Sequence, residues 1–247
     1  MRRLIRADLR RILTKKGFWI FFAITLVVVF FDFEISISSL GVKTGIIALC
    51  GANAAFDIAG FMISLIGFSA LYCDDFRCMS MIPVIGRGLT RDKIVSSKMI
   101  VTVIITFLMY GITALLLYLI GLVECEAMNA EQMVLFIYSL ISKTVGTIIV
   151  ITLASVFLYI TSKIPVSIFV MLVLQVIGNL ASGFLSGFAR RYINMLYFTE
   201  IISSAQSDFV LGARVEAVFT LIACFVCYMA VSFVIIHFTF GKKELDF

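Results

Sequence analysis

The sequence predicts an all-α membrane protein with six transmembrane helices, built as a single transmembrane domain over residues 1–247. Two observations predict this fold class. Hydrophobic residues make up 62% of the chain and charged residues only 14%, whereas soluble domains average about 45–50% apolar and about 25% charged residues. The apolar residues also gather in long runs without charges, as in helices that lipid surrounds. This composition excludes a water-soluble enzyme, a disordered chain and a secreted disulfide scaffold.

Six apolar runs are candidates for membrane-spanning helices, which take about 20 residues each. They cover residues 18–33, 54–73, 99–123, a stretch within 133–162, residues 164–187 and residues 217–240. Transmembrane β-strands alternate apolar and polar residues. Because runs such as 18–31 and 101–122 are apolar on all sides, we expect helices rather than a barrel.

The fourth run is longer than a straight span needs, and Lys143 divides it. One interpretation is an interfacial turn up to Ser142, followed by a span over 144–159. The other is one long tilted helix, with Lys143 reaching outward to the headgroups. The second interpretation is slightly favoured.

Basic residues are unevenly distributed between the two predicted sides of the membrane. With the N-terminus inside, fifteen Lys and Arg residues fall on the cytoplasmic side and four on the outer side. Lys and Arg concentrate in cytoplasmic loops. We therefore expect a multi-pass protein with both termini in the cytoplasm.

Residues 2–16 form a basic amphipathic segment in which Ile5, Leu9 and Ile12 share one helical face. Such a helix lies in the headgroup plane, with its basic residues on anionic lipid. The residues expected to face lipid headgroups are Arg2, Arg3, Arg6, Arg10 and Arg11. The alternative is a plain positively charged anchor without a further role.

The only sizeable predicted cytoplasmic loop covers residues 74–98. Pro83 and the Gly86/Gly88 pair break it into two pieces. Thr90 is a plausible N-cap for a helix that continues into the third span. The apolar residues of this loop suit docking on a soluble partner, and the alternative is an ordinary solvated connector.

The longest outer loop covers residues 188–214. Ile193, Leu196 and Tyr197 have helical spacing, and residues 203–207 read as a polar break. We expect a short amphipathic hairpin at or in the outer leaflet, with an ordinary surface helix as the alternative.

Motifs of catalysis are missing from the sequence. The single histidine, His237, cannot build a metal site of several histidines. There is no G-x-x-x-x-G-K-[ST] motif, so any ATP hydrolysis needs a partner chain. We expect no catalytic residue, metal or cofactor in this chain, and no nucleic-acid partner.

A few polar residues fall at membrane depth, where they are candidates for a substrate pathway. They are Gln175, Asn179 and Lys143. Hydrogen bonding between helices is at least as good an interpretation of Gln175 and Asn179. Gly60, Ser64 and Gly67 form a small-residue face suited to close helix packing. Every Asp and Glu falls near a predicted span end or in a loop, which argues against proton coupling.

Two stretches resemble a known family. Residues 6–20, RADLRRILTKKGFWI, resemble the start of type-2 ATP-binding-cassette permeases. More narrowly, they are similar to short bacterial subunits that export peptide antibiotics such as lantibiotics and bacteriocins, or give immunity to them. Residues 85–98, IGRGLTRDKIVSSK, are similar to the family's G-x-S-R-x-x-I-x-x-S-K stretch before span three, with Thr90 in place of the usual Ser.

The resemblance implies the type-2 exporter permease fold in a bacterial cell membrane. Residues 2–16 would be the interfacial elbow helix, residues 74–98 the coupling loop, and residues 188–214 the re-entrant outer hairpin. Two permease chains, identical or homologous, would pair above two ATPase subunits that hold ATP and Mg. Charged contacts suit such a reversible joint. The residues expected to face the ATPase are Arg77, Met81, Ile82, Arg87, Arg91, Asp92 and Lys93.

These observations predict the membrane-spanning permease subunit of an ATP-driven exporter. Its expected cargo is amphipathic: an antimicrobial peptide, a drug or a lipid-like molecule. A non-transporting scaffold or sensor in a membrane complex is the first alternative. An intramembrane enzyme is the second, and it would need a cluster of His, Asp or Ser that the sequence does not supply at membrane depth.

Overall fold

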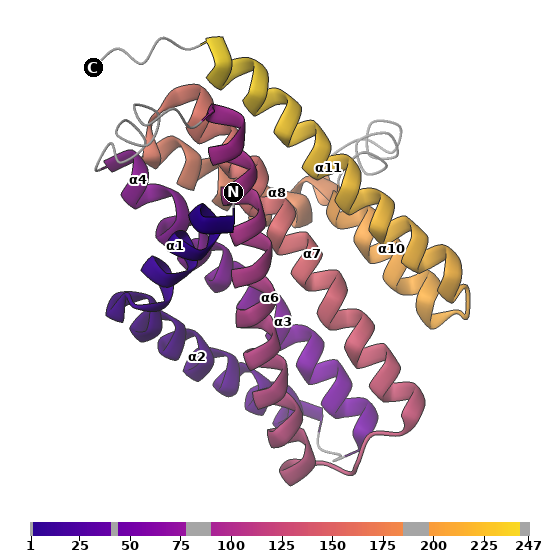
Figure 1. The fold of residues 1–247 in the computed structure, drawn as a ribbon. Coiled ribbons are helices and arrows are strands. Elements are labelled where there is room, and N and C mark those ends of the chain that lie inside the picture. Colours follow the sequence, from indigo (N-terminus) through magenta and orange to yellow (C-terminus); the bar gives the residue numbers. More distant parts are fainter. Residues whose placement is uncertain (1, 41–43, 78–89, 185–197, 243–247) are drawn as a thin grey trace.

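The computed structural model describes residues 2–40, 44–77, 90–184 and 198–242, and every regular element in these ranges is helical. The elements are α1 (Arg2–Leu13), α2 (Lys16–Leu40), α3 (Gly45–Phe68), the π-helical turn η1 (Ser69–Cys73), α4 (Asp74–Arg77), α6 (Arg91–Glu124), α7 (Ala130–Thr161), α8 (Ile164–Phe184), α10 (Phe198–Val210) and α11 (Arg214–Lys242). Figure 1 shows the long helices packed as a bundle. The expected all-α fold class is confirmed.

Five helices in the described ranges are long and apolar enough to cross a membrane. They are Lys16–Ser39, Gly45–Cys73, Arg91–Glu124, Ala130–Thr161 and Arg214–Thr239. Helix α8 begins where the fifth span was predicted, but the apolar stretch described for it, Ile164–Gln175, is shorter. The polytopic architecture is therefore confirmed, and the sixth crossing stays a prediction.

The second span begins earlier than the sequence predicted. It starts at Gly45 instead of residue 54, because residues 45–53 are mostly apolar and continue the same helix. Asp57 consequently lies well inside the span. The inference that every carboxylate falls near a span end or in a loop is wrong for this residue.

Helix α7 is continuous from Ala130 to Thr161, so the long-helix interpretation is confirmed and the interfacial turn before Lys143 is wrong. Its start is fixed by the Asn129 N–H, which donates to Gln132 Oε1 at 2.9 Å. The C-cap residue after its last turn is Ser162, which lies in the left-handed region with φ of 56°. Pro165 follows in the first turn of α8, a position that tolerates proline because the N–H there has no helical partner.

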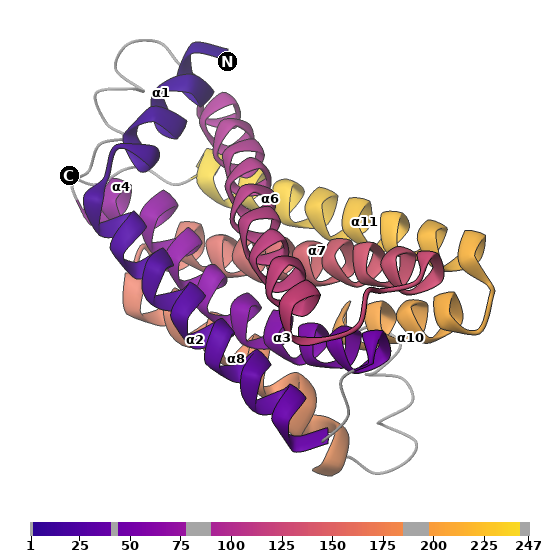
Figure 2. The ribbon, with the colours of Figure 1, turned by 90° about the horizontal axis from the view of Figure 1, so that it is seen from below.

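Helices α3, α6 and α7 form the centre of the bundle, with α2 and α11 further out (Figure 2). In the most apolar stretch of α7, 72% of the residues are buried, whereas in that of α11 only 22% are buried. The small-residue face predicted on the second span is confirmed. A Cβ at Gly60 would lie 2.7 Å from Tyr110 Oη, and one at Gly67 would lie 3.3 Å from Ile151 Cδ1. Neighbouring helices therefore approach α3 closely along this face.

One end of the bundle, here called the basic end, collects α1, α4, the start of α6 and the end of α11. Helix α1 packs on α6, and His237 near the end of α11 contacts Asp92 in the first turn of α6. The described starts and ends of the chain therefore lie at the same end of the bundle. The opposite end collects the start of α3 and the ends of α2 and α6.

Helices α10 and α11 form a hairpin whose turn includes Gly212, with φ of 100°. The polar break expected at residues 203–207 is wrong, because these residues lie inside α10. The Ser204 and Ser207 hydroxyls donate to carbonyls one turn earlier, at 3.0 and 2.7 Å, so the helix satisfies them. Phe209 stacks on Tyr138 of α7, with ring centroids 3.8 Å apart. Residues 188–197 of the predicted hairpin lie outside the described residues.

Candidate functional site

Four charged side chains meet at the basic end, and we call them the basal ion cluster: Asp8 and Arg11 of α1, Asp75 of α4 and Lys98 of α6. The Lys98 ammonium contacts the Asp75 carboxylate and lies 3.2 Å from Asp8 Oδ1. The Arg11 guanidinium donates hydrogen bonds to the Asp75 carboxylate from both terminal nitrogens, and Nη2 lies 3.2 Å from Oδ2. The cluster therefore joins three helices that are far apart in sequence.

Three members of the basal ion cluster are deeply buried, whereas the side chain of the fourth, Arg11, is 38% exposed. Lys98 is 4% exposed, Asp75 3% and Asp8 8%. Charges this far from water are tolerated only when they are paired and hydrogen-bonded, because losing hydration costs several kcal/mol per ion. Two acids and two bases balance here. The arrangement fixes the N-terminal helix to the bases of the second and third spans.

Helix α1 rests on the protein through its apolar face. Ile12 is 1% exposed, and Ile5 and Leu9 pack against the core. The bundle, rather than lipid, therefore covers Ile12. Arg11 also departs from its predicted lipid-facing role, because its guanidinium is engaged with Asp75 and Asp8.

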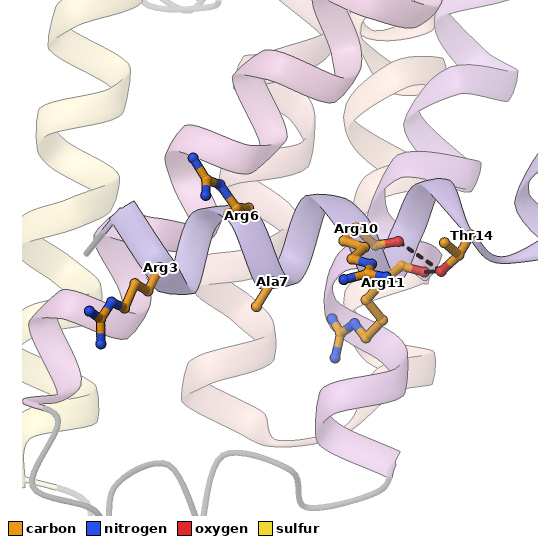
Figure 3. Close-up of a pocket in the computed structure, with 6 residues that line it drawn as sticks. All are labelled: Arg3, Arg6, Ala7, Arg10, Arg11 and Thr14. Atoms are coloured by element: carbon orange, nitrogen blue, oxygen red, sulfur yellow. Dashed lines mark hydrogen bonds between the residues drawn. The ribbon is translucent and has the colours of Figure 1, made fainter.

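The outer face of α1 is lined by arginines. A shallow pocket is lined by Arg3, Arg6, Ala7, Arg10, Arg11 and Thr14 (Figure 3). Its volume is about 540 Å³. The Thr14 hydroxyl donates to the Arg10 carbonyl at 2.7 Å, which closes the end of the helix. Arg2, Arg3, Arg6 and Arg10 are exposed. Their contact with anionic headgroups stays a prediction.

The residues predicted to face an ATPase are only partly described. Arg91, Asp92 and Lys93 lie in the first turn of α6, and Thr90 before them has the extended conformation of an N-cap, with ψ of 144°. Asp92 Oδ1 lies 2.7 Å from His237 Nδ1, so it connects α6 with α11. Arg77 belongs to α4, but its side chain is outside the described residues. Met81, Ile82 and Arg87 also lie outside them.

A second group of polar side chains lies between α3 and its neighbours at membrane depth. Lys143 Nζ of α7 lies 2.5 Å from Asp57 Oδ1 of α3. One turn away, the Ser139 hydroxyl donates to Asn53 Oδ1. Gln206 of α10 donates to the same hydroxyl oxygen at 3.2 Å. Lys143 thus pairs with a carboxylate of the neighbouring helix α3 at membrane depth.

Further along α3 the polar contacts continue. Gln175 Nε2 of α8 donates to Ser64 Oγ at 2.6 Å and lies 3.5 Å from the Gly60 carbonyl oxygen. The interpretation of Gln175 as an interhelical hydrogen-bonding residue is therefore confirmed. The side chain of Asn179 lies outside the described residues. The Tyr110 and Thr147 hydroxyls also share a hydrogen bond of 2.8 Å.

Sequence reasoning missed the acids of both groups. Asp8 was findable, because it is the single acid in α1 and lies among the apolar positions Ile5, Leu9 and Ile12. Asp75 and Lys98 were assigned to a loop, and their partners become visible only in three dimensions. Asp57 was missed because the second span was started too late.

In the described residues no group of three or more His, Cys, Asp or Glu side chains could hold a metal ion. No family model matches the sequence, and a search of curated proteins finds no match. The class that the fold defines is therefore a helical, multi-pass membrane protein.

Proposed function

We propose that the chain is the membrane-spanning permease subunit of an ATP-driven exporter. It moves an amphipathic cargo, such as an antimicrobial peptide, a drug or a lipid-like molecule, out of the membrane or the cell. A separate pair of ATPase subunits binds ATP and Mg. A second permease chain, identical or homologous, completes the pathway. The protein works in a bacterial cell membrane with both termini in the cytoplasm, and export of antibiotics would make it a resistance factor.

The observation that carries this proposal is the basal ion cluster. Asp75 and Lys98 flank the connector over residues 78–89 in sequence, and both are held by α1. A partner that pushes on the connector therefore acts on α3, α6 and α1 as one unit. Such rigid joining is what a soluble motor needs in order to move membrane helices. The resemblance of residues 85–98 to a coupling stretch agrees with this role.

Movement would also reach the last span. Asp92 in the first turn of α6 contacts His237 near the end of α11. Both side chains are about half exposed, so this contact is accessible from the basic end. ATP-driven closure of the two ATPase subunits would thus displace α3, α6 and α11 together, while the outward arginines of α1 hold anionic lipid.

Charge reversal at Arg87 of the connector and at Arg91 in the first turn of α6 tests the docking step. The double variant Arg87→Glu with Arg91→Glu should abolish co-purification of the ATPase with the full chain, and should abolish resistance to the exported compound. Lys163→Glu is the matched control, because Lys163 is a basic residue of the other predicted cytoplasmic loop and is exposed. It should keep both properties.

If the double variant keeps ATPase association and transport, the docking surface is wrong. If the wild-type chain assembles with the ATPase, but cells that lack the chain are as resistant as cells that have it, the scaffold or sensor alternative replaces the exporter. These two results are separable, because association and resistance are measured independently.

A further inference from the structure

Asp57 lies at the end of an open face of α3. Ile46, Cys50, Ala54 and Asp57 follow one another on the same side of this helix, and all four are exposed. We call these four residues the α3 lane. It runs from the opposite end of the bundle to Asp57. At about 1.5 Å per helical residue, Asp57 lies roughly 18 Å from the start of α3, which is close to mid-depth for a hydrocarbon core of about 30 Å.

The ion pair at this depth is asymmetric. The Asp57 side chain is 64% exposed and the Lys143 side chain 25%. The group that faces outward is therefore the carboxylate, while the ammonium lies behind it against α7. The lane leading to it is apolar or small. An apolar approach that ends in an outward carboxylate has the chemistry of a site for an apolar molecule with one positive charge.

Lipid tails alone do not cover such a group favourably. Charged side chains in membrane spans face a protein interior, a water-filled cavity or a charged partner, because hydrocarbon does not solvate them. One such occupant would be a second copy of this chain seated on the same face. A two-fold interface would bring the outward carboxylates of two Asp57–Lys143 pairs towards each other, each with its less exposed ammonium behind it. Charge complementarity therefore favours a cation.

We propose that Asp57, presented by the α3 lane and backed by Lys143, is the recognition site for the positive group of a lipophilic cation. The apolar body of the ligand lies along Ile46, Cys50 and Ala54, and its cationic group contacts the Asp57 carboxylate in competition with Lys143. The identification of this ligand with the cargo rests on the proposed export function, but the binding itself does not. It narrows the cargo from amphipathic molecules in general to cationic ones.

The residues around the site hold it in place. Gln175 of α8 reaches Ser64 two turns further along α3, and Ser139 of α7 reaches Asn53 one turn before Asp57. These contacts fix α3 against α7 and α8 on both sides of the pair. The carboxylate is thereby presented at a defined depth.

Two probe ions of nearly equal size and opposite charge test the site, tetraphenylphosphonium and tetraphenylborate. Equilibrium binding is measured on the full chain in phosphatidylcholine nanodiscs, and binding to empty nanodiscs is subtracted. We expect saturable binding of tetraphenylphosphonium and none of tetraphenylborate. Asp57→Asn should weaken the cation's binding by at least about tenfold, because it removes one partner of a desolvated charge contact. Asp208→Asn, at an exposed acid of α10, is the matched control and should leave the binding unchanged.

A charge swap separates recognition from folding. Asp57→Lys combined with Lys143→Asp keeps an ion pair between α3 and α7 but places the ammonium in the outward position. It should reverse the preference, so that tetraphenylborate binds and tetraphenylphosphonium does not. If the swapped protein folds and shows no reversal, the pair only holds the helices together and the proposal is wrong.

Equal saturable binding of both ions to the wild-type chain, or saturable binding of neither, would also overturn the proposal. So would a stable dimer whose interface covers Cys50. If the wild-type chain binds tetraphenylphosphonium but exports no compound, the proposed function is wrong and this site is not affected. Retained export of a cationic compound by Asp57→Asn would count against the site alone.

Discussion

The basal ion cluster and the Asp57–Lys143 pair use the same chemistry in opposite surroundings. In the cluster, Asp75 and Lys98 are 3% and 4% exposed and are held by residues of α1. In the pair, the carboxylate side chain is 64% exposed and has a single ion-pair partner among the described residues. The carboxylates and the ammonium of the cluster are enclosed by protein, and its Arg11 side chain is 38% exposed, whereas the carboxylate of the pair is open at membrane depth.

This difference separates a structural joint from a site that can exchange partners. A buried ion pair is poor as a net source of stability, but removal of one partner strands the other and is strongly destabilising. In an open pair one charged group is not enclosed by protein, so a ligand can reach it and compete with its partner. We therefore expect substitutions in the cluster to unfold the basic end, and substitutions in the pair to change binding.

The largest effect is expected for Lys98→Met, which leaves the two buried carboxylates of Asp75 and Asp8 with Arg11 as the only cation of the cluster. Breaking a buried pair in this way costs about 3–5 kcal/mol, which thermal unfolding of the detergent-solubilised chain measures. Lys93→Met is the control, because Lys93 lies on the same helix and is exposed; it should change stability by less than about 0.5 kcal/mol. A mild effect of Lys98→Met would remove the reason for treating the cluster as a joint.

A smaller loss is expected for Gly60→Ala, which tests how rigidly the neighbours of the pair are held. The new Cβ would lie 2.7 Å from Tyr110 Oη and 3.3 Å from Thr147 Oγ1, so α6 and α7 would have to shift. Overpacking of this kind costs about 1–3 kcal/mol. Gly111→Ala is the matched control, because its Cβ would meet nothing within 4 Å, and helix propensity predicts a slight gain. If both glycines tolerate alanine equally, the close packing around the pair is not rigid.

Asp57→Asn should reduce stability less than Lys98→Met does, because the Asp57 and Lys143 side chains are 64% and 25% exposed and the asparagine oxygen can still accept a hydrogen bond from Lys143. A double-mutant cycle with Lys143→Gln measures the coupling directly in chemical unfolding. The same cycle on Lys98 and Asp75 gives the reference value. If the two coupling energies are equal, the open pair holds its helices together as strongly as the buried cluster does, and the contrast between the two regions is wrong.

The smallest effect is expected for Gln175→Leu, which removes the 2.6 Å hydrogen bond to Ser64. Hydrogen bonds between membrane helices average about 0.6 kcal/mol. Equilibrium unfolding should show a loss of about this size. A loss several times larger would mean that α8 depends on this single contact.

Much of the fold followed from the sequence because lipid imposes a simple rule. Long uncharged runs have to be helices, and the runs beginning near Phe18, Met99 and Ala217 all correspond to long helices. Thr90 was recognised as a helix start from its side chain and its place before a periodic segment. These are local signals, which a single sequence contains in full.

The errors arose where polar residues are satisfied by distant partners. The second span was predicted to begin only after Asn53, but Ser139 of α7 satisfies the Asn53 side chain inside the span, and Lys143 pairs there with Asp57. The serines of α10 suggested a break, but their hydroxyls bond within the helix. The basal ion cluster joins residues more than sixty positions apart, a distance over which sequence spacing gives no information.

The central claim is that this chain transmits the work of a separate ATPase through its basic end. The most direct test is ATP hydrolysis by the complex that purifies with the tagged full chain from membranes of the cells that express it naturally. We predict ATPase activity in the wild-type and Lys163→Glu preparations, and its loss in the Arg87→Glu, Arg91→Glu double variant at equal yield of the chain. A wild-type preparation without ATPase activity, or activity that the double variant leaves unchanged, would contradict the account.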